Sequence, residues 1–569
     1  MNTNKNQPVA VEFIKENSNF LRGTIASELG NEVTGSISEN DTQISKFHGI
    51  YQQDDRDLRK ERSKQKLEPL YSFMIRARVP GGICTPEQWL AIDDMADRYA
   101  NGSIRITTRQ AFQFHGVIKK NLKPTIAAIN QQLMDTIAAC GDVNRNVMCT
   151  ANPELSSIHY RVYQDAKAIS DHLTPQTSAY HEIWIDGEKV KSESKTDHEP
   201  IYGKTYLPRK FKIAVVIPPD NDVDVLAHDL GFIAIIENHE LVGYNVTVGG
   251  GMGTTHGDSS TFPLLAHTLG FCTPDQVLLV AENTVKIQRD HGDRTNRKHA
   301  RFKYTVDDHG IDWLRGQLSD HMGQPLLAAK KIEFTHNGDR FGWRKNLDGS
   351  WNHTLFIANG RVKDDGMNSL RTALREIAQI HQGNFRLTAN QNLIIAQVPD
   401  SAKNQIDQLL GLYKINQQVS LTRQLSMACV ALPTCSLAMA EAERYLPELI
   451  NQIDGLQQKH HISNRGIMIR MTGCPNGCAR PFIAEIGFVG KALGRYNMYL
   501  GGKPDGTRLN QLYLENITES DILKQLDDIF SHYAKDAISN ESFGDFVIRA
   551  QYVSAVTHGK QVHLKWVES

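Results

Sequence analysis

Two periodicities alternate along the chain, one typical of strands and the other typical of helices. Apolar residues recur at every second position from Tyr71 to Val79, which predicts a strand with one buried face. Residues 86–99 carry apolar positions at helical spacing behind a proline, which predicts a helix. Further strands are predicted over 213–218, 232–236 and 244–248, and further helices over 264–269 and 274–288. This alternation indicates the α/β (α+β) class.

The first 65 residues differ from the rest because they are polar and densely charged, most of all over 54–62. Such a composition is typical of a solvated arm or helix. The alternative is an arm that docks a partner or wraps the body of the protein. We expect a polar N-terminal arm over residues 1–65 that serves in partner docking.

One predicted strand, over residues 102–115, has an unusual polar face. If the segment stays extended, apolar side chains such as Ile104 and Phe114 point to one side. The opposite side then carries Arg105, Arg109, Gln113 and His115. A solvated sheet face would produce this pattern, and so would a face that binds an anionic ligand.

Two segments are repeated later in the chain. Residues 102–110 match residues 383–391 in spacing and alternation, 281 positions on, and residues 243–250 match residues 495–502, 252 positions on. Both matches occur in the same order. They predict the duplication of a unit of about 250 residues and a pseudo-twofold axis.

The charge balance excludes several classes of partner. Lys and Arg number 63 and Asp and Glu number 64, so no global attraction to nucleic acid or to an anionic membrane is expected. Residues 1–19 lack the basic and apolar regions of a signal peptide, and no run of 18 apolar residues occurs. We therefore expect a cytoplasmic protein.

The eight cysteines fall into two groups. Cys84, Cys140, Cys149 and Cys272 are scattered and are interpreted as small buried hydrophobic residues. The other four, Cys429, Cys435, Cys474 and Cys478, form a CX5C pair and a CX3C pair separated by 38 residues.

The spacing of the second group favours an iron–sulfur cluster. Four thiolates from two loops can enclose a [4Fe–4S] cluster, and Gly473 and Gly477 allow close approach of the backbone. Zinc and unligated cysteines are the alternatives. Structural zinc sites prefer two to four residues between paired cysteines, and CX5C is wider than that.

The cysteine motifs, with TGCPNGC at 472–478, resemble those of the siroheme-dependent sulfite and nitrite reductase family. Shorter matches extend the resemblance over nearly the whole chain, at residues 47–53, 105–115, 144–146, 206–212, 249–251 and 388–392. Within the family the chain is most similar to the bacterial NADPH-dependent branch, which works in sulfate assimilation and cysteine biosynthesis. The resemblance implies six-electron reduction of sulfite to hydrogen sulfide.

The resemblance also implies an organisation into domains. Behind the arm, residues 66–138 and 340–415 would form a pseudo-twofold pair of ferredoxin-like halves. Residues 139–339 would form an α/β domain that binds siroheme and substrate, and residues 416–569 an α/β domain that holds the cluster.

By the same resemblance, Cys429, Cys435, Cys474 and Cys478 hold the cluster, and Cys478 bridges it to the siroheme iron. Siroheme carries eight carboxylates, so its pocket must be basic. The implied siroheme contacts are Arg105, Arg109, Gln113, His115, Lys298 and Asn476. Lys298 belongs to a basic run over residues 289–303, for which a solvated helix is the alternative.

Four cations are implied to bind sulfite, namely Arg76, Arg145, Lys210 and Lys212. Two of them agree with the local pattern, since Lys210 and Lys212 are two apart on a predicted strand and share a face. Solvated surface charges are the alternative for each. Family nitrite reductases usually carry Asn at the position of Lys212, which favours sulfite here.

The electron donor must be another protein. The glycine-rich GGGMG at 249–253 does not have the spacing of a nucleotide-binding GxGxxG, and no flavin motif is evident. The resemblance implies a flavoprotein (FAD/FMN) reductase subunit that oxidises NADPH. Alternatives are a ferredoxin-dependent sulfite reductase, a siroheme nitrite reductase, and a non-catalytic iron–sulfur or zinc protein.

Overall fold

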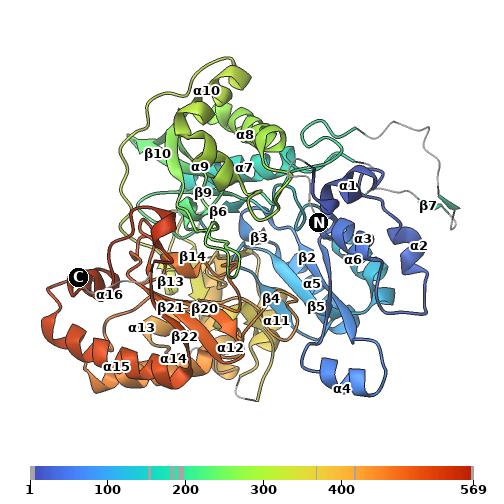
Figure 1. Ribbon diagram of the computed structural model, residues 1–569. Helices are drawn as coiled ribbons and strands as arrows, with labels where there is room; N and C mark the ends of the chain where they lie inside the picture. The colour runs from blue at the N-terminus through green and yellow to red at the C-terminus, as the bar shows by residue number, and fades with distance from the viewer. Residues whose placement is uncertain are drawn as a thin grey trace.

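The computed structural model describes residues 7–151, 156–177, 179, 184–185, 188–189, 198–366, 368–415 and 418–564. The first six residues of the expected arm lie outside the described residues, as do parts of the expected 139–339 domain. Within the described chain, four five-stranded sheets and one two-stranded sheet are present (Figure 1). No helix in these ranges has the length and apolar character needed to traverse a bilayer.

Two of the sheets are built by two halves that exchange an edge strand. One has the order β1 (Ile50–Asp54), β2 (Tyr71–Ala77), β5 (Phe112–Val117), β4 (Ile104–Ile106) and β15 (Arg361–Val362). The other has the order β13 (Gly342–Lys345), β14 (Trp351–Leu355), β17 (Leu393–Val398), β16 (Asn384–Leu387) and β3 (Ile83–Cys84). Each half thus contributes the last strand of the other half's sheet, and both halves share one hydrophobic core.

The other two sheets have the same topology as each other. The first runs β6 (Met148–Cys149), β9 (Ile213–Val216), β10 (Leu230–Glu237), β11 (Glu240–Val248) and β12 (His267–Cys272). The second runs β18 (Met427–Ala428), β19 (Ile469–Thr472), β20 (Ile486–Ala492), β21 (Arg495–Leu500) and β22 (Gln511–Ile517). In both, the first three strands are parallel and the last two antiparallel. The predicted duplication is confirmed.

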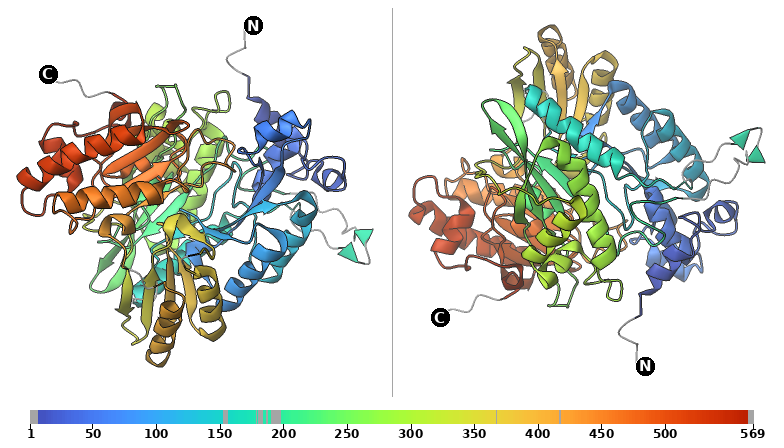
Figure 2. Two further views of the ribbon diagram at one scale, coloured as in Figure 1. Left: turned by 90° about the horizontal axis from the view of Figure 1, so that it is seen from below. Right: turned by 90° about the horizontal axis from the view of Figure 1, so that it is seen from above.

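Helices cover these sheets from outside. α5 (Pro86–Tyr99) has the predicted bounds, and a capping box at Thr85 fixes its first residue. It contacts α11 (Leu370–Ile380) of the other half. α7 (Ser157–His172) and α8 (Val277–His291) pack beside the first duplicated sheet, and α14 (Leu446–Lys459) and α15 (Glu519–Asp536) beside the second. The C-terminal helices and the N-terminal segment lie on opposite sides of the molecule (Figure 2).

The described N-terminal segment wraps the body, so its interpretation as a solvated arm is wrong for most of its length, although the densely charged residues 59–64 form an exposed helix. It carries α1 (Ala10–Glu16), α2 (Ile25–Leu29), α3 (Glu39–Ile44) and α4 (Arg59–Lys64) around strand β1. Leu21, Ile44 and Phe47 belong to the core of the first α/β unit. The buried Lys15 pairs with Glu12 at 2.6 Å. Partner docking by this segment stays a prediction.

Two local predictions are wrong. Residues 102–115 form a hairpin of β4 and β5 instead of one strand, with a turn at Gln110, whose φ is +50°. The repeat has the same turn at Gln391, with φ +70°. Residues 264–269 are not helical, because Leu264 bridges to Gly251 and β12 then pairs with β11. Pairing with a neighbouring strand outweighed local helix propensity there.

Candidate active site

One large cavity lies where the two kinds of sheet meet. Its walls come from β1, β2, the β4–β5 hairpin, the segments around 139–146 and 209–212, and both cysteine loops. Its volume is about 1680 Å³, including the space at its open mouth. Segments from all parts of the chain therefore converge on a single site.

The lining of this cavity is strongly cationic. Six arginines and two lysines reach it, and no carboxylate does, among the residues that the structure describes; the eight are Arg76, Arg105, Arg109, Arg145, Arg209, Lys210, Lys212 and Arg480. Three have a carboxylate partner behind the wall, since Arg105 pairs with Glu443, Arg209 with Asp142, and Arg480 with Asp224. The other five have no carboxylate within ion-pair distance in the described chain. Such a surface fits a polyanionic ligand.

All four cations predicted to bind substrate line the cavity. Arg76 and Arg145 are fixed by backbone carbonyls, and both donate to Ala139 O, at 3.1 and 3.3 Å. Arg145 also donates to Gly141 O at 2.8 Å. These bonds orient two guanidinium groups without neutralising them, so each keeps donors for an anion in the cavity.

Lys210 and Lys212 lie in an extended segment just before β9 rather than on a strand, and both line the cavity. Phe211 between them is buried, and its backbone bonds to the segment around residues 143–145. No hydrogen bond or ion pair of either ammonium occurs within the described residues. Burial, and then the neighbouring Arg209, lowers the pKa of Lys210 to about 7. Burial and the Lys210 ammonium hold the pKa of Lys212 well below its usual range.

The four predicted residues of the hairpin also line the cavity. Arg105 and Gln113 are paired across β4 and β5, whereas Arg109 lies in the turn. Arg109 donates to Ile213 O at 3.2 Å, but its Nε is buried without a partner. Both ring nitrogens of the buried His115 also lack a partner, and burial lowers its pKa well below the usual range. Unsatisfied buried donors beside unneutralised arginines fit a cofactor with several carboxylates.

The four clustered cysteines form another part of the wall. Gly473 N–H donates to Cys429 Sγ at 3.3 Å, and Asn476 Nδ2 donates to Cys474 Sγ at 3.5 Å. A Cβ at Gly473 would lie 2.5 Å from Ala440 O, and Gly477 has φ +61°, so both glycines are required. Burial raises the pKa of Cys429, and the neighbouring Cys478 and Cys474 raise it further.

This arrangement of thiols fits a cluster better than a single ion. Within the described ranges, no three His, Cys, Asp or Glu side chains are grouped so that they could hold one metal ion. Each thiolate of a [4Fe–4S] cluster binds a different iron, so the four sulfurs need not converge on one point. N–H groups that donate to the thiolate sulfurs, as those of Gly473 and Asn476 do, orient and tune the ligands of such a cluster.

Lys298 is the one predicted cofactor contact that does not line the cavity. Its side chain is 58% exposed and its Nζ lies 3.3 Å from Asp258. Two other cations of the same basic run turn inward, since Arg301 pairs with Asp229 at 3.0 Å and Lys303 binds backbone carbonyls. The solvated interpretation therefore holds for part of this run only, and the siroheme contact of Lys298 stays a prediction.

Sequence reasoning missed Arg209, His228 and Arg480, which all line the cavity. Arg480 donates to Thr108 O at 3.1 Å and to Ala389 O at 2.9 Å, the turns of the two repeated hairpins. The duplication could have pointed to Arg480. Arg480 and its partner Asp224 occupy matching positions in the two repeats, since both have φ near +50° just before matching short helices. Arg480 thus joins the cysteine loop to both halves.

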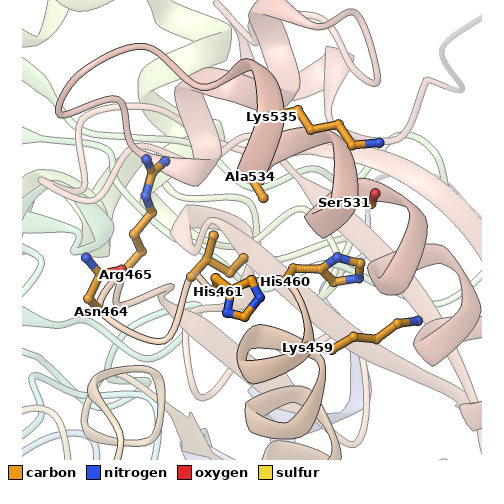
Figure 3. Close-up of a pocket in the computed structure, with 9 residues that line it drawn as sticks. Lys459, His460, His461, Asn464, Arg465, Ser531, Ala534 and Lys535 are labelled. Carbon is orange, nitrogen blue, oxygen red and sulfur yellow. The ribbon is translucent and has the colours of Figure 1, made fainter.

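A separate pocket lies between the C-terminal end of α14 and α15 (Figure 3). It is lined by Lys459, His460 and Arg465, among others, and shares no residue with the cationic cavity. Lys459 and His460 are both paired with Asp527. Partly neutralised and without thiols, this pocket is a weaker candidate for the chemistry.

Comparison with known families gives two matches. The model for the "Nitrite and sulphite reductase 4Fe-4S domain" matches residues 164–326, which precede the four clustered cysteines. The model for the "Nitrite/Sulfite reductase ferredoxin-like half domain" matches residues 65–132 and 344–413. Together they cover more than half of the chain.

Comparison with single proteins gives near full-length matches. The sulfite reductase [NADPH] hemoprotein beta-component of Anoxybacillus flavithermus is 57% identical over 558 residues, covering 98% of both chains. That of Staphylococcus epidermidis is 56% identical, covering 97% of both. Among solved structures, the NirA protein of Mycobacterium tuberculosis matches with a TM-score of 0.78 at 23% identity, covering 96% of this chain and 97% of that one. That likeness supports the fold.

Proposed function

The chain belongs to the nitrite and sulfite reductase family, and on that premise we propose that it reduces sulfite to hydrogen sulfide as the hemoprotein component of an NADPH-dependent sulfite reductase. One observation carries the proposal. Among the residues that the structure describes, the same cavity is lined by four thiols on one wall and by eight cations, with no carboxylate in the lining. A scaffold protein needs no such anion pocket, and a zinc site needs no such set of cations.

The proposed cofactors are siroheme and a [4Fe–4S] cluster, which when bound supply one-electron transfers. Cys429, Cys435, Cys474 and Cys478 would hold the cluster, with Cys478 nearest to siroheme. Arg105, Arg109, Gln113, His115 and Asn476 would bind the carboxylates of siroheme. Arg209 and Arg480 reach the same cavity and join this proposed set.

Sulfite reduction takes sulfur from +4 to −2, so it consumes six electrons, and the three oxygens leave as water after protonation. Arg76 and Arg145 would hold the oxygens, because their guanidinium groups are fixed from behind and unneutralised. Lys210 and Lys212 would donate protons. An ammonium with a pKa near neutrality gives up its proton more readily than an ordinary lysine.

Electrons would arrive from a partner subunit, which we propose is a flavoprotein that oxidises NADPH in the cytoplasm. The relatives' name includes NADPH, yet no GxGxxG spacing occurs in this sequence.

We retain the proposed division of the chain into four units, namely the arm, the ferredoxin-like halves and the two α/β domains. Strand β1 of the expected arm joins the sheet of the ferredoxin-like halves, so the arm and that unit are structurally continuous.

The test uses the purified protein. Its absorption spectrum should contain siroheme bands, and chemical analysis should find four cluster irons with acid-labile sulfide and no stoichiometric zinc. Reduced viologen should support conversion of sulfite to sulfide. Stoichiometric zinc without labile sulfide would refute the proposal, and a large preference for nitrite would reassign the substrate.

A further inference from the structure

The segment that follows β1 lies against the first cysteine loop. Arg56 Nη1 donates to Cys435 O at 3.1 Å and also to Ala438 O, although 379 and 382 residues separate the partners. The backbone N–H of Arg56 donates to Pro433 O at 3.3 Å. One half-buried residue of the N-terminal segment therefore binds three backbone carbonyls around a single thiol.

Backbone bonds within the loop, and from Met439 and Ala440 N–H to Gly473 O, hold the rest of that stretch. The loop forms a turn in which Cys435 N–H bonds to Ala431 O and Ala438 N–H bonds to Cys435 O. Beyond it, Ser436 is exposed and Leu437 is 63% exposed. The carbonyls at the end of a single turn lack partners within it, as at a helix C-terminus. Arg56 supplies a donor to Ala438 O and a second donor to Cys435 O, which already accepts from Ala438 N–H.

Among the four clustered cysteines, Cys435 is the one whose backbone Arg56 binds. Arg56 donates to the carbonyl of Cys435 and to that of Ala438. Ala438 is therefore bound to Cys435 O through its N–H and to Arg56 through its carbonyl. A shift of Arg56 would move the turn that carries the Cys435 side chain.

The same segment also reaches the cavity. Tyr51 and Gln53 of β1 line it, five and three residues before Arg56. Beyond Arg56, Asp57 pairs with Arg444 at 2.9 Å, just after the cysteine loop. Strand and contacts together fix Arg56 relative to both the sheet and the loop.

We propose that Arg56 is a positioning residue that closes the Cys429–Cys435 loop over the cluster and places one positive charge beside it. This inference rests on the proposed function, since it presumes the cluster. It assigns to the N-terminal segment a role within the chain, in addition to any partner docking. Arg56 touches neither substrate nor reacting atoms.

The test compares Arg56→Ala and Arg56→Lys with Arg59→Ala as the matched control. Arg59 is a nearby arginine that pairs with Asp54 at 2.7 Å and does not touch the loop. Two quantities are measured on the purified holoprotein, namely the rate of iron loss to a chelator and the midpoint potential of the cluster in an EPR-monitored redox titration.

We expect Arg56→Ala to lose iron about tenfold faster than the wild type, because hydrogen bonds from a charged donor are removed. The midpoint potential should become more negative, since a positive charge favours the reduced cluster. Arg56→Lys should restore the potential and only part of the iron retention, because lysine lacks the planar fork. Arg59→Ala should match the wild type in both.

Equal iron loss and an unchanged potential in Arg56→Ala would overturn the inference. Equal acceleration in Arg59→Ala would also overturn it, because the effect would then be general loosening of the segment. If Arg56→Ala does not fold, Arg56→Lys still decides, since wild-type iron retention there refutes the need for the fork. A wild-type protein without labile sulfide would instead refute the proposed function.

Discussion

Replacing Lys212 by Asn is the sharpest test of how the cavity treats sulfite. Lys212 lines the cavity and has no hydrogen-bond or ion-pair partner in the described chain, so its ammonium is available to a ligand. Burial and Lys210 hold its pKa well below the usual range, and a lowered pKa makes the ammonium a stronger acid. Asn keeps a polar group at the position but removes the charge and the transferable proton.

The magnitude follows from the number of remaining donors. Removing one donor to developing negative charge costs about 100- to 1,000-fold in rate when nothing replaces it. Lys210 still reaches the cavity and can replace part of the charge, so we expect a loss nearer to 100-fold. Cofactor content should not change, because the variant removes a cation that carries no structural bond.

The assay is viologen-driven turnover on sulfite and on nitrite, with the absorption spectrum recorded beside it. Lys330→Asn is the control, since Lys330 is an ordinary surface lysine paired with Glu237 at 2.7 Å. We expect the sulfite rate to fall and the sulfite-to-nitrite ratio of kcat/KM to fall with it. If both cofactors are retained and the ratio equals that of the control, Lys212 does not discriminate between the substrates.

Four further predictions follow from the same site. Cys474→Ser should abolish acid-labile sulfide in iron and sulfide analysis, whereas a zinc protein would contain none at the outset. Deleting residues 1–60 should lower Tm and abolish viologen-driven and partner-driven activity alike, because β1 and buried core residues are lost. Selective loss of the partner-driven rate would instead show that the segment mainly docks the partner. The isolated chain should not oxidise NADPH in a spectrophotometric assay, and turnover would contradict the need for a donor. Because the pKa of Lys210 is lowered to about 7, its ammonium is charged below that pH and neutral above it. The KM for sulfite should therefore rise more steeply with pH in the wild type than in Lys210→Arg. Parallel pH profiles would show that Lys210 does not bind sulfite as a cation.

The sequence alone determined the features that depend on neighbouring residues. Alternation over residues 71–79 and helical spacing over 86–99 gave β2 and α5, because burial of one face acts within a single element. The repeats 281 and 252 residues apart predicted a duplication, and the structure has matching hairpins and matching sheets there, since duplicated segments fold alike. The cysteine spacing indicated one cluster site, because four thiolates in two loops have few other uses.

Tertiary structure decided which charged residues face the cavity. Lys298, Arg301 and Lys303 lie in one basic run, yet one is exposed and the other two turn inward to partners far along the chain. No periodicity marks Arg480, whose bonds reach both hairpin turns, or Arg56, whose partner Cys435 is 379 residues away. Hydrophobic burial repeats with the period of the local element, whereas an ion pair or a capped loop depends on which distant surfaces are packed together.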